Sequence, residues 1–195
     1  MFGNHVKLNP VAAPQMVNIV IEGVKGVGKN AMYVRLRDGI FVESHDGPCD
    51  PTTRWINVDN EEHIYDLIVT SEDNNFSAYN DLTRKDCEVF MLIYSEDSPE
   101  SFEYLAVVWQ KIEQIRHSNN FPVVVVANKT DLAYHKVSTQ SGEDFARSHG
   151  VPFIAVSVRT GKSVDKILPT LIREYRKKNP RTHFSAPKER KCTIC

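Results

Sequence analysis

The stretch VNIVIEGVKGVGKN, residues 17–30, decides the fold, because an apolar, β-branched run is followed at once by a glycine-rich turn and a lysine. The run is continuous rather than alternating, which is typical of a strand covered on both faces of a parallel sheet. The turn, residues 23–30, fits the spacing G-x-x-x-x-G-K between a strand and a helix. We therefore expect a phosphate-binding loop at the carboxyl end of the first strand.

This loop supplies the groups that bind phosphate. Glycines let the backbone wrap tightly, so that successive N–H groups point at phosphate oxygens, and Lys29 adds a positive charge. The alternative is a glycine-rich turn that merely connects a strand to a helix. The predicted phosphate-binding residues are Gly23, Lys25, Gly26, Val27, Gly28, Lys29, Asn30 and Ala31.

Asn30 departs from the pattern, because a Ser or Thr hydroxyl normally follows the lysine and binds Mg²⁺. An amide oxygen can ligate a metal, but the side chain is longer and Mg²⁺ demands near-ideal octahedral geometry. The sequence thus predicts strong phosphate binding and weak Mg²⁺ binding.

Further apolar runs predict the rest of the architecture. They cover residues 89–94, 123–127 and 153–156, and segments with helical periodicity follow them. Ser98 and Ser163 are predicted helix N-caps. Residues 53–58 and 63–70 are predicted to form a hairpin through the turn at residues 59–61.

These elements predict an α/β fold with a six-stranded, mostly parallel sheet and helices on both faces. Ligands of such sheets bind beyond the carboxyl ends of the strands. We expect one domain over residues 16–178, preceded by a flexible extension, residues 1–15, and followed by a basic flexible tail, residues 179–195.

The third apolar run ends in NKTDL, residues 128–132. At the end of a strand, the Asp131 carboxylate could accept hydrogen bonds from N1–H and the exocyclic amine of guanine, two donors that adenine lacks. Sites of this kind discriminate by about 10⁴ to 10⁵. Lys129 is long enough to lie over the purine ring, and Asn128 can brace the loop.

With these two motifs the chain resembles the Ras-like small GTPases over residues 16–178 and the last four residues. The resemblance implies a P-loop G domain that binds GTP and GDP and acts in signal transduction. It implies that Phe41 packs on the base, that residues 157–160 cover guanine through backbone groups, and that Thr52 closes over the γ-phosphate and Mg²⁺. The nucleotide-binding residues added by the resemblance are Phe41, Thr52, Leu132, Ser157, Val158 and Arg159.

Several catalytic and metal-binding residues of the Ras-like small GTPases are replaced in this chain. The D-x-x-G-Q motif aligns with residues 69–73, so that Val69 replaces a magnesium-holding aspartate, Glu72 a glycine, and Asp73 the glutamine that orients the attacking water. Lys25 replaces a glycine and crowds both that water and an incoming arginine. No catalytic residue is intact, and only Asn30 and Thr52 remain as weak metal ligands. We expect very slow GTP hydrolysis.

Two other functions remain open: a conventional GTPase in which Glu72 or Asp73 recovers the metal, and a nucleotide-free scaffold. An adenylate-type kinase is more distant. As a further hypothesis, Lys25 replaces part of the missing metal charge beside the phosphates.

The chain ends in CTIC, residues 192–195, which matches C-a-a-X and predicts prenylation of Cys192, with farnesyl or geranylgeranyl left open. The alternative is a C-x-x-C redox or zinc pair. A single lipid attaches weakly, but basic residues upstream add attraction to an anionic leaflet. We expect the cytoplasmic face of a membrane, most simply the plasma membrane.

Composition narrows the remaining function classes. The chain has 24 Lys and Arg residues and 25 Asp and Glu residues, so its net charge is −1. This charge does not favour nucleic-acid binding. No apolar run approaches the ~20 residues of a membrane helix. The 4 cysteines are too few for a disulfide framework. We expect a monomer in a reducing compartment; the sequence names no effector or regulator.

Overall fold

The computed structural model describes residues 15–43, 53–71 and 77–180. One six-stranded sheet has the order β2-β3-β1-β4-β5-β6, with β2 antiparallel to β3 and the other neighbours parallel. The strands are β1 (Gln15–Glu22), β2 (Arg54–Val58), β3 (Glu61–Val69), β4 (Val89–Ser95), β5 (Val123–Asn128) and β6 (Phe153–Ala155). The predicted six-stranded, mostly parallel sheet is confirmed.

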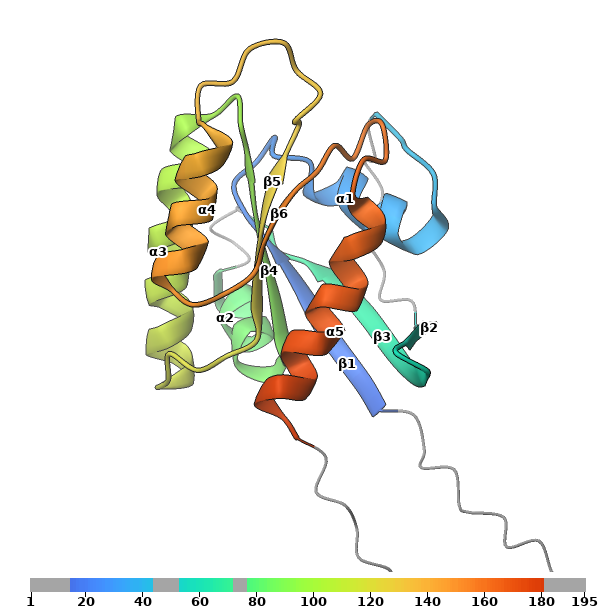
Figure 1. Cartoon of the computed structure of the whole chain (residues 1–195). Coiled ribbons are helices and arrows are strands. Elements are labelled where there is room, and N and C mark those ends of the chain that lie inside the picture. Colours follow the sequence, from blue (N-terminus) through green and yellow to red (C-terminus); the bar gives the residue numbers. More distant parts are fainter. Residues whose placement is uncertain (1–14, 44–52, 72–76, 181–195) are drawn as a thin grey trace, which may run out of the picture.

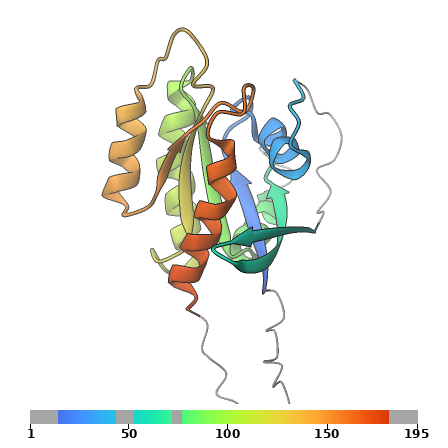
Figure 2. The same cartoon turned by 45° about the vertical axis from the view of Figure 1, so that its right-hand side comes forward.

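Helices cover both faces of this sheet, as predicted. Figures 1 and 2 show α1 and α5 on one face and α3 and α4 on the other, with α2 beside α3. The helices are α1 (Lys29–Asp38), α2 (Ser77–Asp86), α3 (Pro99–Arg116), α4 (Thr139–Ser148), the short 3₁₀ helix η2 (Val164–Lys166) and α5 (Ile167–Lys178).

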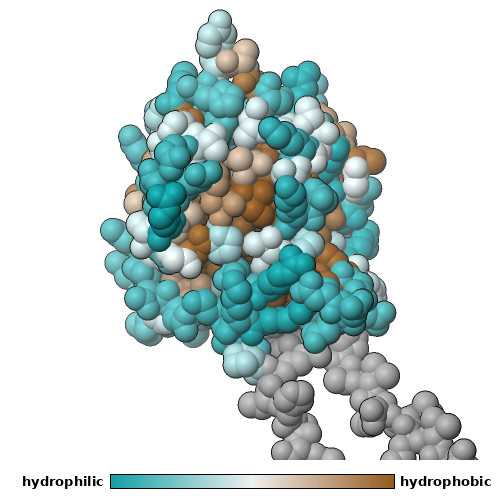
Figure 3. Space-filling view, in the orientation of Figure 1, coloured by the Kyte–Doolittle hydropathy of each residue, from teal (hydrophilic) through white to brown (hydrophobic). Residues whose placement is uncertain are grey.

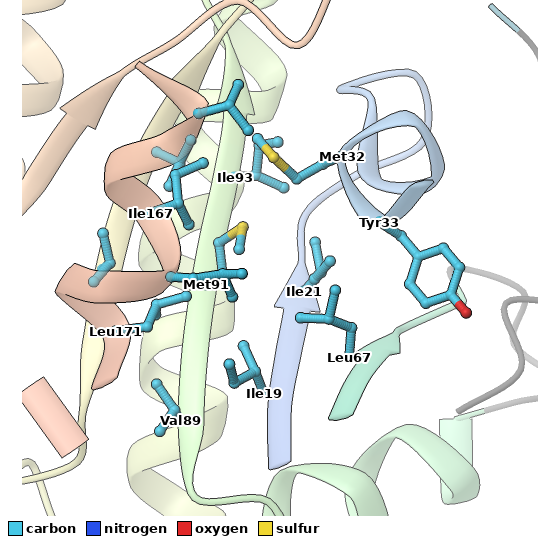
Figure 4. Packing of buried hydrophobic residues seen from close by; sticks show 14 of the residues in the cluster. Ile19, Ile21, Met32, Tyr33, Leu67, Val89, Met91, Ile93, Ile167 and Leu171 are labelled. Atoms are coloured by element: carbon cyan, nitrogen blue, oxygen red, sulfur yellow. The ribbon is translucent and has the colours of Figure 1, made fainter. Parts of the chain in front are cut away.

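Alternate residues of the central strands feed two apolar cores. Ile21 and Met91 pack with Met32 of α1 and Ile167 of α5 on one face (Figure 4). On the other face, neighbouring strand residues pack against α3 and α4, where Trp109 is one of the anchors. Every residue of β4 and β5 is buried, which explains why these strands are continuous apolar runs in the sequence.

The face seen in Figure 3 is mainly hydrophilic, with an apolar area near its middle, where β6 lies between α4 and α5. Each residue of β6 is half-buried, because it is an edge strand with a neighbour on one side alone. Among the described residues, no helix is long and apolar enough to span a bilayer.

Two local predictions were wrong. The hairpin turn has two residues, Asp59 and Asn60, both at positive φ, so Glu61 already belongs to β3. Such a turn matches the twist of the flanking strands better than a longer one. Ser163 does not cap the last helix: its φ is 58°, it precedes the 3₁₀ turn, and α5 begins at Ile167. Ser98 does cap α3, since its side chain accepts from the N–H of Ser101.

A buried ion pair ties α2 to the end of β1. Arg84 donates to both carboxylate oxygens of Glu22, from Nε at 2.8 Å and from a terminal nitrogen at 3.1 Å. Thr70, just after β3, donates to the same carboxylate at 3.0 Å. Burial lowers the pKa of Arg84, but Glu22 outweighs it and the pKa lies above its usual value. Both side chains are almost wholly buried, at 4% and 1% exposure, so neither charge is hydrated.

We predict that Arg84→Met lowers the free energy of unfolding by about 3–5 kcal/mol, because it leaves the Glu22 carboxylate buried without a cation. The double variant Glu22→Val with Arg84→Met should recover most of this loss, since both charges are gone. Urea unfolding measures the difference. Arg147→Met, at an exposed pair with Asp144, is the control and should change stability by less than about 0.5 kcal/mol. An Arg84→Met protein as stable as the parent would contradict the prediction.

Candidate functional site

The loops that follow β1, β5 and β6 lie at one edge of the sheet, at the top of Figure 1. After β1, Gly26 and Gly28 have φ of 85° and 97°, values that L side chains rarely adopt. Gly28 is the N-cap of α1, and no side chain caps the helix there. The first N–H groups of α1 are therefore not capped by a side chain, which is the arrangement that suits an anion.

Lys29 is held inside this loop. Its ammonium donates to the backbone oxygens of Gly23 at 2.5 Å and Val24 at 3.0 Å, and the residue is 9% exposed. These bonds fold the side chain back over the loop, so the positive charge sits at the start of α1 instead of extending into solvent. The charge and the helix end thus favour an anion at the same place.

Asn128, the last residue of β5, joins three loops. Its side-chain nitrogen donates to the Val27 backbone oxygen at 2.7 Å, and its side-chain oxygen accepts from the Val158 N–H at 3.1 Å. The side chain passes so close to Gly28 that a Cβ there would lie 2.5 Å from the amide nitrogen. A side chain on residue 28 would therefore displace this bridge.

Asp131 and Ser157 come together from separate loops. The Ser157 hydroxyl donates to one carboxylate oxygen of Asp131 at 2.7 Å and accepts from the Thr160 N–H at 3.1 Å. Ser157 is fully buried, whereas Asp131 is exposed. The serine thus fixes the direction of a carboxylate that faces solvent. The sequence predicted only backbone contacts from this loop, and nothing in its spacing indicated the hydroxyl's role.

Lys129 lies beside the phosphate loop and makes an ion pair with Asp97 at 3.2 Å. Burial raises the pKa of Asp97, but hydrogen bonds from Ser95 and Lys129 outweigh it and bring the pKa below its usual range. Lys25, Lys129 and Asp97 line a cavity of about 440 Å³. The cavity is also lined by Gly26, Val27, Ser95, Ser98, Pro99, Glu100 and Lys136.

The other predicted site residues are spread around these loops. Asn30 and Arg159 are exposed, Ala31 and Leu132 are half-buried, and Phe41 is 37% exposed just after α1. Thr52, Glu72, Asp73 and Cys192 lie outside the described residues.

Among the described residues, the groups next to the phosphate loop offer few ligands for Mg²⁺. Val69 ends β3 and pairs with Ile21, so an apolar side chain occupies the strand end next to the phosphate loop. Glu22, the carboxylate nearest in sequence to that loop, is engaged by Arg84. Within the described ranges, no three His, Cys, Asp or Glu side chains are grouped to hold a metal.

A nucleophilic role for Cys87 is not supported. Burial raises the pKa of its thiol to about 12, so the thiolate is scarce at neutral pH.

The sequence was also compared with models of protein families. The model of the Ras family matches residues 18–177, a range that covers the sheet and its helices, except for the start of β1 and the last residue of α5, and all three loops of the site.

We predict that Asn128→Ala lowers the free energy of unfolding by about 2–4 kcal/mol, because it leaves the Val27 oxygen and the Val158 N–H buried without partners. The urea midpoint measures this. Asn120→Ala, at an exposed position before β5, should stay within about 0.5 kcal/mol of the parent. Equal stability of the two variants would show that the bridge does not hold the loops together.

Proposed function

We propose that this chain, which belongs to the Ras family, is a membrane-anchored signalling protein that binds guanine nucleotide and hydrolyses GTP very slowly. Membership of the family makes it a small GTP-binding protein. Slow hydrolysis, membrane attachment and the signalling role are the proposal, and each has its own support and its own test.

The site residues support tight nucleotide binding. Lys29 and the uncapped start of α1 favour the phosphates. Asp131, oriented by Ser157, offers carboxylate oxygens to the two N–H groups on the guanine edge. Asn128 fixes the distance between these two parts of the site, so phosphates and base are bound by one connected structure.

The observation that carries slow hydrolysis is Val69 at the carboxyl end of β3. The family resemblance implies an aspartate there, and a valine side chain has no oxygen to offer a metal or its water. Phosphoryl transfer depends on positioning and charge neutralisation, and the arginine contribution alone is worth about 10³ to 10⁵ in rate. Lys25, exposed beside Gly26, adds bulk where the family has a glycine.

Lys25 also supports nucleotide binding that depends little on Mg²⁺. It lies in the phosphate loop, and in the described part of the chain no ion pair engages it. A cation near phosphate oxygens supplies some of the attraction that a metal would provide.

We predict that protein purified from cells and then boiled releases GTP, because bound GTP is hydrolysed more slowly than the protein is purified. Chromatography of the supernatant identifies the nucleotide. GDP would favour a conventional GTPase with relocated catalytic residues, and an empty pocket together with no GTP heat in calorimetry would favour a nucleotide-free scaffold.

The purified protein, before boiling, tests the role of Lys25. EDTA should weaken GTP binding by less than about tenfold in the parent chain, whereas Lys25→Gly should become much more sensitive to the chelator. Equal sensitivity of both proteins to EDTA would show that Lys25 does not replace the charge of a metal. The proposal that the protein binds guanine nucleotide would still stand.

The tail supports membrane attachment from its sequence. Cys192 begins the C-a-a-X box, and α5 ends with Arg176, Lys177 and Lys178 in its last turn. Basic residues near an anionic leaflet add about 1 kcal/mol each to a single lipid, which alone attaches marginally. In Figure 1 the end of α5 lies at the opposite end of the domain from the three site loops.

We predict that Cys192→Ser abolishes prenyl incorporation and moves the protein from the membrane fraction to the soluble fraction of eukaryotic cells. Cys195→Ser is the matched control, because a final serine still completes a C-a-a-X box. Mass spectrometry of the tail and fractionation measure both effects. Loss of the lipid from both variants alike, or from neither, would contradict prenylation at Cys192.

A further inference from the structure

The head group of Lys129 is held by a carboxylate from another loop. Its ammonium donates to the two carboxylate oxygens of Asp97, at 3.2 and 3.5 Å. Asp97 lies between β4 and α3, whereas Lys129 follows β5, so the pair joins the loops after two neighbouring strands. The two side chains are 34% and 36% exposed. An ion pair this exposed adds little to the stability of the domain, so its main effect is on where Lys129 lies.

Asp97 is itself fixed in direction by Ser95, the last residue of β4. The Ser95 hydroxyl donates to one carboxylate oxygen of Asp97, and Ser95 is buried. The backbone of Ser95 is tied to the first turn of α3, because its N–H donates to the Ser101 hydroxyl at 3.0 Å and its oxygen accepts from that hydroxyl at 3.2 Å. The carboxylate that binds Lys129 is thus attached to a strand and to a helix.

The backbone of Lys129 also constrains its side chain. Its φ is 64°, in the left-handed region that residues with a Cβ rarely adopt. Its oxygen accepts from the Leu132 N–H at 3.1 Å, and the side chain of Asn128, just before it, is hydrogen-bonded on both sides. Such a conformation persists where the surrounding structure holds it. Lys129 is therefore fixed at its backbone and at its ammonium, with its apolar stem between the two.

The pair lies next to the phosphate loop. Lys129 and Asp97 line the same cavity of about 440 Å³ as Lys25 and Gly26. An unpaired ammonium in this cavity would be attracted to the phosphates of a nucleotide, because opposite charges attract strongly at short range. Asp97 neutralises the ammonium of Lys129 from 3.2 Å, which weakens that attraction.

We propose that Asp97 is a positioning residue for the guanine base: it holds the Lys129 ammonium so that the Lys129 stem covers the purine ring. The inference rests on the proposed guanine binding and adds a residue that acts through Lys129 instead of touching the nucleotide. A lysine side chain has much conformational entropy to lose, and one that already lies in its binding position loses less when the ligand arrives. Without the Asp97 charge the stem is free to move, and the nucleotide binds more weakly.

The sign of the effect separates positioning from simple electrostatics. Asp97 is a negative charge in a cavity that receives an anion, so repulsion alone predicts that its removal strengthens nucleotide binding. Positioning predicts the opposite, a weaker affinity. Asp97→Asn makes the comparison, because the amide has nearly the same shape and keeps an oxygen for the Ser95 hydroxyl. The side chain is 36% exposed, so the variant is expected to fold.

The test is calorimetry of GDP binding to the full-length protein, freed of bound nucleotide, and to Asp97→Asn, Lys129→Met and the double variant. We expect Asp97→Asn to weaken GDP binding by about three- to fivefold, in the range of an exposed ion pair. In the Lys129→Met background, which has no ammonium to hold, the same change should no longer weaken binding. Glu100→Gln is the control for charge, because it removes a carboxylate from the same cavity, and its GDP affinity should equal or exceed that of the parent.

IDP binding shows which contact with the base has changed. IDP lacks the exocyclic amine, so the ratio of GDP to IDP affinity reports the hydrogen bond of that amine to Asp131. The Lys129 stem covers the ring of either base, so Asp97→Asn should weaken both nucleotides by the same factor and leave the ratio unchanged. A variant that merely disturbed the loop would move Asp131 and lower the ratio.

Unchanged or stronger GDP binding by Asp97→Asn would overturn the positioning role. So would an equal loss in the Lys129→Met background, an equal loss in Glu100→Gln, or a lower GDP-to-IDP ratio in Asp97→Asn. In each of these cases the proposed guanine binding would stand. Absence of GDP binding by the parent protein would instead remove the proposed function, and the role of Asp97 with it.

Discussion

The site depends on the side chain of Asn128 being hydrogen-bonded on both sides. Its amide joins the backbone of Val27 in the phosphate loop to the backbone of Val158 in the loop after β6. The phosphate-binding and base-reading parts arise about a hundred residues apart, and their spacing is set by these two bonds together with the parallel pairing of the strands between them. Gly28 is required for the same reason, since a Cβ there would collide with the amide.

Much of the fold could be predicted because each buried strand carries its own signal. β4 and β5 are covered on both faces, so every residue is apolar or buried, and the strand is visible as an unbroken run. The phosphate loop was visible because its glycines and Lys29 are neighbours in sequence. The prediction for Ser163 was wrong because a serine before a run of apolar residues at helical spacing can precede either an α-helix or a 3₁₀ turn. In this chain a 3₁₀ turn follows Ser163, and α5 begins only after that turn.

Interactions between distant residues left no such signal. α2 was missed because its apolar side chains Tyr79 and Leu82 are exposed, and its position is held instead by Arg84 on Glu22 and by Asn80 on Ser71. Glu96 lies in the polar stretch SEDS, residues 95–98, which is typical of a solvated turn, yet its side chain is fully buried. The Ser157 hydroxyl on Asp131 likewise joins residues whose spacing carries no periodicity.

The buried pair of Glu22 and Arg84 also constrains how this sequence can diverge. Two buried charges of opposite sign are tolerable together, and an apolar pair of similar volume would be tolerable as well, but losing Arg84 alone leaves the Glu22 carboxylate in the interior without a cation. Losing Glu22 alone leaves Arg84 with Asp81 as its ion-pair partner, at 2.9 Å. A mutational path that changes Arg84 first therefore crosses a state whose loss is a large fraction of the stability of an ordinary domain. The two positions are therefore expected to covary among descendants of this chain, with strong epistasis between β1 and α2.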